Sequence, residues 1–241
     1  MSDAAAVGFR QSRGWLFSPE PLRLAKADVA QLERLGHPLR MFQQGCDRIY
    51  RRSVKGSLPG WIAQLLDAGK PSWLVEAQRS DALRDVAPRV IRPDLLLTAD
   101  GFALTELDAV PGGMGITGWL SRRYGKEGYE ILGGNSGMLE GFRSLLPEGG
   151  EVLVSEEAAD YRLEMEWLVK ELNLLGGGRW GMQSAEKFKA GNGDPALYRF
   201  FELFDWESIP AAQALAPRPD LTPPFKPHFE EKLWLALLWS P

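Results

Sequence analysis

Two acidic residues at the end of a predicted strand have the spacing that best suggests chemistry in this chain. Glu106 and Asp108 stand two positions apart in the apolar run ALTELDAV, so the alternation of a strand directs both carboxylates to one face. Neighbouring negative charges repel each other unless a cation lies between them. Mg²⁺ prefers oxygen ligands and is commonly held by one or two carboxylates together with substrate phosphates. The spacing therefore predicts a magnesium site.

A glycine-rich stretch directly follows these acids. It contains Gly112 and Gly113, with Gly115 and Gly118 shortly after them. Glycine lets the backbone pass close to a ligand and turn its N–H groups toward an anion, and the start of the next helix also favours negative charge. We therefore expect a phosphate or carboxylate beside the predicted metal. The alternative is that the acids are simply exposed at a hairpin end and that the glycines serve a steric turn.

The elements that must position this motif are predicted to be mixed α and β. Apolar residues make up 44% of the 241 residues, which is sufficient for a sizeable buried core. The first ninety residues follow the helical period, and residues 90–110 contain two apolar runs joined by a turn at 99–101, which predicts a β-hairpin. The helices expected before the hairpin are 26–54, interrupted at Pro38, then 61–66 and 72–83.

The second half predicts a parallel βαβ unit. A short β-rich run begins at Glu151, a helix over 158–175 ends in a glycine run, and another short apolar segment follows. Two short helices are expected before this unit, at 116–124 and 136–146, and a strand is expected after it, at 197–201. A proline-rich connector then leads into an apolar helix that begins near His228 and needs cover on most sides.

Composition argues against several functional classes. A net charge of −4 gives no strongly basic surface for a nucleic acid. The N-terminus lacks a secretory signal, and no window approaches the roughly 18 apolar residues of a membrane span. Cys46 is the single cysteine, which excludes an internal disulfide and fits the cytoplasm, and it is expected to be a core thiol. His37 and His228 lack ligand-spaced partners, so no zinc site is expected.

One acidic segment is expected to be structural. The stretch SEEAADYRLEMEW lies near the positive N-terminal end of a predicted helix, where acidic side chains are stabilising. We expect its acids to form a solvated face; they are Glu156, Glu157, Asp160, Glu164 and Glu166.

The block RPDLLLTADGFALTELDAVPGGMG, residues 92–115, resembles a signature of the circularly permuted ATP-grasp ligases, which include glutathione synthetase and glutathionylspermidine synthetase. That family has an Arg-x-Asp strand, a second strand that ends in Glu-x-Asn, and a small-residue loop. Asp stands here at the position of the Asn, which keeps an oxygen ligand but adds a charge. The corresponding residues are Arg92, Asp94, Glu106 and Asp108, followed by Gly112 and Gly113.

The resemblance implies an ATP-dependent ligase that joins a small-molecule acid to a small-molecule amine and forms the amide through an acyl phosphate. Glu106 and Asp108 would bind Mg²⁺ at the ATP phosphates, and Arg92 would be catalytic and contact the acid or its acyl phosphate. The loop glycines, Gly112 and Gly113, would bind substrate. A segment that resembles the Tyr-x-Arg segment of the family, ALYRFFELFDW, would place Arg199 near the substrate.

Three alternatives stay open. Arg92 could be a structural partner of Asp94 or Glu106, because structural ion pairs produce the same pattern. Arg199 lies between two aromatic residues and could be a cation–π residue of the core. The whole chain could also be a degenerate ATP-grasp relative without catalysis, which binds a peptide, an amino compound or a partner subunit.

The resemblance divides the chain into four segments: a helical N-terminal region (1–89), the hairpin and glycine-loop part of an ATP-grasp-like domain (90–147), a βαβ region like the family's substrate domain (148–210), and the connector with the apolar helix (211–241). Most of the nucleotide site follows in the permuted order of the family. We therefore expect the natural protein to continue past Pro241 and this chain alone to be inactive, or a dimer partner or other subunit to cover the apolar helix.

Overall fold

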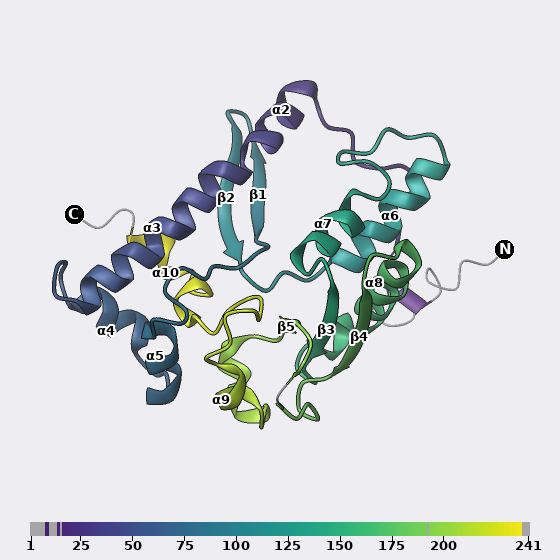
Figure 1. Ribbon diagram of the computed structural model, residues 1–241. Coiled ribbons are helices and arrows are strands. Elements are labelled where there is room, and N and C mark those ends of the chain that lie inside the picture. Colours follow the sequence, from purple (N-terminus) through teal and green to yellow (C-terminus); the bar gives the residue numbers. More distant parts are fainter. Residues whose placement is uncertain (1–7, 10–13, 15, 192, 238–241) are drawn as a thin grey trace. The chain divides into compact units, whose positions relative to one another are not determined.

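The computed structural model describes residues 8–9, 14, 16–191 and 193–237 (Figure 1). The protein belongs to the predicted α/β class, with helices, one two-stranded sheet and one three-stranded sheet. The chain folds into two compact units. Unit 1 contains Met1–Leu24 and Pro111–Phe201, and unit 2 contains Ala25–Val110 and Glu202–Pro241. Within the described residues, no helix is long and apolar enough to cross a membrane.

The first half of unit 2 is helical, as predicted. The helical run breaks at Leu35, and Pro38 lies in the first turn of the second helix, where the N–H that proline lacks would have no helical partner. The last of these helices is shorter than predicted, because the backbone is already extended at Ser80. The helices are α2 (Lys26–Arg34), α3 (Gly36–Val54), α4 (Trp61–Asp67) and α5 (Ser72–Arg79).

The predicted hairpin is confirmed. Strands β1 (Arg92–Thr98) and β2 (Gly101–Asp108) pair antiparallel, with Thr98 opposite Gly101 and a bulge after Asp94. Gly101 has a φ of 115°, a value that residues with a side chain rarely adopt, so the tight turn requires glycine here. The open end of the hairpin brings the first residue of β1 opposite the last residue of β2.

The predicted apolar helix near the C-terminus begins later than expected. A 3₁₀ turn, η3 (Pro227–Phe229), occupies the start of the run, and α10 extends over Leu233–Leu237. Trp234 of α10 packs in a buried cluster with Cys46 and other side chains of α3 and α4, so these helices cover one face of α10. Burial raises the pKa of Cys46 to about 12, which confirms the predicted core thiol. Leu238 and Trp239 lie outside the described residues.

Unit 1 contains the predicted βαβ unit. Strands β4 and β5 both pair parallel with β3, in the order β4-β3-β5, and α8 connects β3 to β4. The core of this unit contains buried β3 residues such as Val152 and the apolar stripe Met165, Leu168 and Leu172 of α8, which packs against β4. The elements are α6 (Met114–Lys126), α7 (Gly137–Leu145), β3 (Gly149–Val154), η1 (Ala159–Tyr161), α8 (Arg162–Leu175), β4 (Arg179–Ser184) and β5 (Leu197–Phe200).

Two short elements complete unit 2 between Phe201 and η3. They are η2 (Leu203–Ser208) and α9 (Ala212–Leu215), and they precede the proline-rich connector. Trp73 of α5 packs edge-on against Trp206 of η2, with ring centroids 5.6 Å apart. This contact joins the helical first half of unit 2 to the segment that returns to it after unit 1.

Candidate functional site

The open end of the hairpin brings together four charged residues that the sequence singled out. Arg92 stands opposite Asp108, and Asp94 stands opposite Glu106. The Arg92 guanidinium lies 2.8 Å from Asp94 Oδ1 through Nε and 3.2 Å from Asp108 Oδ2 through Nη2. The Val110 N–H donates to the other oxygen of Asp108 over 2.8 Å. Arg92 therefore ties the two strand ends together.

Glu106 has a basic partner from a distant part of the chain. Lys232 Nζ lies 2.8 Å from Glu106 Oε1, and this contact raises the pKa of Lys232. Burial raises the pKa of Asp108, and the negative charges of Glu106 and Glu230 raise it further. The hydrogen bond from the Val110 N–H and the positive charge of Arg92 lower this pKa and so oppose the effect of burial. The acidic side chains at the hairpin end thus lie close enough to affect one another, and Arg92 and Lys232 partly neutralise their negative charge.

These acids line a hollow of about 680 Å³ within unit 2. Leu74 and Trp206 contribute apolar wall, while most of the charged lining residues are acidic. A hollow of this size accommodates a small molecule, and its excess of carboxylates favours a cation or an amine. The acidic lining residues are Glu106, Asp108, Glu202, Glu207, Glu230 and Glu231, and the basic ones are Lys70 and Lys232.

The hairpin end fits Mg²⁺ in ligand type but does not form a complete metal cage. Among the described residues, no group of three or more His, Cys, Asp or Glu side chains is placed to hold a metal ion. Glu106 and Asp108 offer two carboxylates, which is the usual protein share of a magnesium site completed by substrate phosphates and water. A metal ion there would share Asp108 with Arg92 and would compete with Lys232 for Glu106.

The glycine loop lies in unit 1, where its amides already have an acceptor. The Gly113 N–H donates to Glu164 Oε1 over 2.7 Å, and the Ile116 N–H donates to Glu164 Oε2 over 3.1 Å. Glu164 is only 3% exposed, so its predicted place on a solvated helix face was wrong. The carboxylate instead satisfies amides at the start of α6, where helical N–H groups lack internal partners.

Packing also explains the glycine at position 112. A Cβ on Gly112 would lie 2.5 Å from the ring of Tyr161, which is closer than a side-chain carbon can approach. Gly113 has a φ of 84° and directly precedes α6, where glycine is suited to a left-handed backbone. These contacts favour the steric interpretation of the loop.

Arg199 lies on β5 in unit 1 and is fully buried. Its guanidinium donates to the carbonyl of Phe201 and lies 5.3 Å from the centroid of the Phe201 ring. A buried guanidinium with an aromatic neighbour is a cation–π arrangement. These contacts favour the core interpretation of Arg199 over the substrate-binding one.

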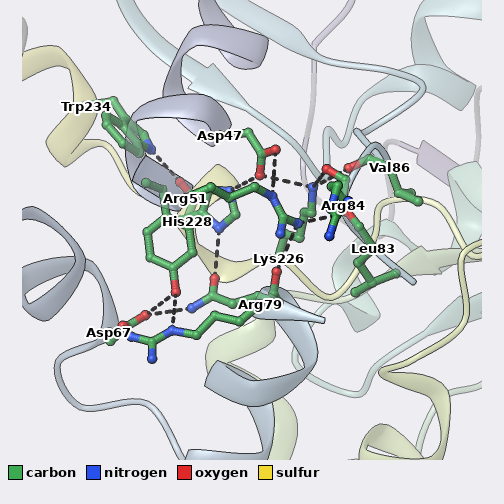
Figure 2. A network of polar contacts seen from close by, with 12 residues as sticks. Asp47, Arg51, Asp67, Arg79, Leu83, Arg84, Val86, Lys226, His228 and Trp234 are labelled. Atoms are coloured by element: carbon green, nitrogen blue, oxygen red, sulfur yellow. Dashed lines mark hydrogen bonds and ion pairs between the residues drawn. The ribbon is translucent and has the colours of Figure 1, made fainter. Parts of the chain in front are cut away.

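A buried cluster around Asp47 was not predicted from the sequence (Figure 2). We call it the Asp47 network, which contains Asp47, Arg51, Gln78, Lys226 and His228. Oδ1 of Asp47 lies 3.0 Å from Lys226 Nζ and 2.9 Å from His228 Nε2, and Oδ2 lies 3.1 Å from Arg51 Nε. Both Lys226 and His228 are buried, so one carboxylate compensates basic groups that have almost no access to water.

His228 extends the network toward α4 and α5. Its Nδ1 lies 2.8 Å from Gln78 Oε1, and the Gln78 amide donates to Asp67 over 2.7 Å. The imidazole stacks on Tyr50 with ring centroids 4.4 Å apart, and Trp234 Nε1 donates to the His228 carbonyl over 2.6 Å. The network therefore joins α3, α4, α5, η3 and α10 (Figure 2).

Burial and charge act in opposite directions on these groups. Burial raises the pKa of Asp47, but hydrogen bonds and charges from His228 and Lys226 outweigh it and lower that pKa to about 2. Burial also lowers the pKa of Lys226 and of His228, while Asp47 opposes both changes. Spacing could not reveal the network, because Asp47 and Lys226 lie 179 residues apart.

No protein-family model matches the chain, and no curated protein matches its sequence. The resemblance to ATP-grasp ligases therefore rests on the residues 92–115 and the weaker segments named above.

Proposed function

We propose that this chain forms part of an ATP-dependent carboxylate–amine ligase that makes an amide through an acyl phosphate, with partial ATP-grasp architecture. One observation carries the proposal. The charged residues that the resemblance singles out, Arg92, Glu106 and Asp108, meet at the open end of the hairpin, and both acids line a hollow large enough for a small-molecule substrate.

Each residue has a role that its chemistry supports. Glu106 and Asp108 would hold Mg²⁺ through their carboxylate oxygens. Arg92 would bind anionic oxygens of the substrate with its planar guanidinium, which matches carboxylate and phosphate groups. Its pairs with Asp94 and Asp108 fix the guanidinium at the strand ends. A bound magnesium nucleotide would supply the phosphoryl group that makes the substrate carboxylate reactive.

The rest of the hollow suits the amine substrate. Its remaining acidic lining residues, which include Glu207, would attract the amine as an ammonium ion, while Glu231 already pairs with Lys70. Apolar wall from Leu74 and Trp206 would exclude water from part of the site. No side-chain nucleophile is required, since this chemistry depends on positioning the reactants and neutralising their charge.

The second candidate function is a binding module without catalysis. It is favoured by the contacts of Arg92 with Asp108 and of Lys232 with Glu106, because these pairs neutralise the acids without a metal. Such a module would bind an amino compound or a peptide amine in the acidic hollow.

The carboxylate of Glu106 separates the two functions. We expect Glu106→Ala to weaken the binding of Mn²⁺, used as a paramagnetic substitute for Mg²⁺, by at least about tenfold in the presence of a non-hydrolysable ATP analogue. Electron paramagnetic resonance measures the free Mn²⁺. A ligase that contains this chain should lose turnover with the same substitution, because charge neutralisation at the phosphates would fail.

The matched control is Glu33→Ala, which removes an exposed carboxylate from α2. It should leave Mn²⁺ affinity unchanged. If wild-type protein binds amines but binds no Mn²⁺, with or without the nucleotide analogue, the binding module is favoured over the ligase. Equal Mn²⁺ affinity in wild type and Glu106→Ala would remove Glu106 from the metal site.

A further inference from the structure

A row of basic side chains runs along the exposed face of α3 and ends at Lys55, the residue that follows its last turn. Arg48, Arg52 and Lys55 follow one another at intervals of four and three residues, which places them on the same side of the helix. We call these three residues the basic row. All three are exposed, and within the described part of the chain none lies within ion-pair distance of an acidic side chain. Like charges at this spacing repel each other, so the row favours an anion that would bridge them.

The basic row borders a hollow of about 450 Å³ within unit 2. Arg51 and Arg84 also line this hollow, and Asp47 and Asp85 are its acidic lining residues. Asp47 is turned toward Lys226 and His228 (Figure 2). Arg84 pairs with Asp81. The hollow therefore has an excess of positive charge that its own acids do not balance.

Buried contacts hold the opposite wall of this hollow in place. Arg51 Nη2 donates to the carbonyls of Gln78 over 3.3 Å and of Leu83 over 3.1 Å. Lys226 Nζ donates to the carbonyls of Arg84 over 3.4 Å and of Val86 over 2.7 Å. Residues 83–86 are thus fixed against α3, so this wall of the hollow is preformed, as the walls of most small-molecule sites are.

We propose that this hollow binds an extended phosphate-bearing small molecule with two or more phosphate groups. From Arg48 to Lys55 the helix rises about 10 Å, so a single phosphate cannot contact the whole row. Basic side chains bind phosphate oxygens through strong charge-assisted hydrogen bonds. The row covers two helical turns of a chain with a net charge of −4, which is a small basic surface for a nucleic acid.

The site is independent of the proposed ligase function. The basic hollow and the acidic hollow at the hairpin end have no lining residue in common. The chemistry of the two also differs, because one would hold a metal ion and an amine whereas the other would hold phosphates without a metal. Phosphate binding at the basic row can therefore be measured in a variant that lacks the Glu106 carboxylate.

Calorimetric titration of the full chain with inorganic tripolyphosphate, at low salt and without divalent metal, tests the proposal. Wild-type protein should bind tripolyphosphate more tightly than orthophosphate, and added salt should weaken binding. We expect Arg52→Gln to weaken it by at least about tenfold, the effect of losing one charge-assisted hydrogen bond. Arg48→Gln combined with Arg52→Gln should remove measurable binding. Both side chains are exposed, so these variants should fold, which circular dichroism checks.

Two control variants complete the experiment. Arg40→Gln removes an exposed arginine from the same helix but outside the hollow, and it should bind like wild type. Glu106→Ala should also bind like wild type, whether or not the ligase proposal is correct. Tighter binding of ATP than of tripolyphosphate would assign a nucleotide to the site, and equal binding would assign a polyphosphate group alone.

Three outcomes would overturn the proposal. The first is no tripolyphosphate binding by wild-type protein at low salt. The second is equal loss of affinity in Arg40→Gln and Arg52→Gln, which would indicate attraction to the general charge of α3. The third is loss of binding in Glu106→Ala, which would place the phosphates at the acidic hollow.

Discussion

The hairpin end and the Asp47 network are both clusters of ion pairs within unit 2, but they differ in their access to water. In the network, Lys226 is 1% exposed and His228 is completely buried. At the hairpin end, the side chain of Arg92 is 41% exposed and that of Lys232 is 71% exposed. Residue types alone would not distinguish the two clusters, because each combines carboxylates with basic groups at similar distances.

This difference determines which cluster can exchange partners. An exposed ion pair contributes little stability, because water and salt screen its charges, so a ligand can replace one partner at small cost. A buried charge that loses its partner is left without water or counter-charge, so its partners are fixed. We therefore expect ligands to exchange at the hairpin end and the Asp47 network to stabilise the fold.

The largest expected effect is that of Asp47→Ala. The substitution leaves Lys226 and His228 buried without their shared carboxylate, and breaking a buried pair in this way costs about 3–5 kcal/mol. Urea denaturation followed by circular dichroism measures the loss in the free energy of unfolding. The control is Asp81→Ala, which removes an exposed partner of Arg84 and should cost under about 1 kcal/mol. Similar losses in both variants would contradict the comparison.

Glu164→Ala extends the comparison to a buried carboxylate that has amide partners in unit 1. It removes the acceptor of the Gly113 and Ile116 N–H groups, and each buried donor left without a partner costs about 1–3 kcal/mol. Glu166→Ala removes an exposed acid from the same helix and should be close to neutral. If Glu164→Ala were equally neutral, water would have to reach these amides easily. Denaturation curves of the two variants distinguish the cases.

The pH dependence of stability tests the charge state of the network. The pKa of Asp47 is lowered from 3.8 to about 2, so its charged form stabilises the fold above about pH 4 and this stabilisation is lost as the pH falls toward 2. The shift corresponds to about 2 kcal/mol. The free energy of unfolding of wild type should therefore fall by about this amount more than that of Asp47→Asn between about pH 5 and pH 2. Parallel curves would show that Asp47 contributes no pH dependence.

Local patterns predicted most of the secondary structure. Helical periodicity identified α2 to α5, and the turn at 99–101 identified the hairpin, because both signals depend on neighbouring residues. The predicted start of the apolar helix, near His228, was wrong, because a 3₁₀ turn at Pro227–Phe229 precedes α10 and Trp234 packs against a distant cluster. Tertiary contacts decided this boundary, and the local sequence does not contain them.

The candidate site was accessible to sequence reasoning only within the hairpin. Strand alternation brought Glu106 and Asp108 to one face, but it could not identify Lys232 as the partner of Glu106. Nor could it reveal that Glu164, 51 residues after Gly113, accepts from the loop amides. The residues of the basic row, Arg48, Arg52 and Lys55, stand at helical spacing in the sequence. The net charge of −4 gives no indication of this local basic surface. Partners brought together by folding need the structure.

Lys232→Gln is expected to have the smallest effect on stability, but it directly tests whether a metal ion competes with Lys232 for Glu106. The side chain is mostly exposed, so the urea midpoint should stay unchanged. The ammonium group occupies Glu106 Oε1, so its removal should raise the affinity for Mn²⁺ with an ATP analogue by about two- to fivefold, the strength of an exposed pair. Lys26→Gln, an exposed lysine on α2, is the control and should change neither quantity. Weaker Mn²⁺ binding in Lys232→Gln would mean that Lys232 helps to hold the phosphates instead of competing with the metal. In that case a ligand would not replace Lys232 as the partner of Glu106, and the proposed difference between the hairpin end and the Asp47 network would be lost.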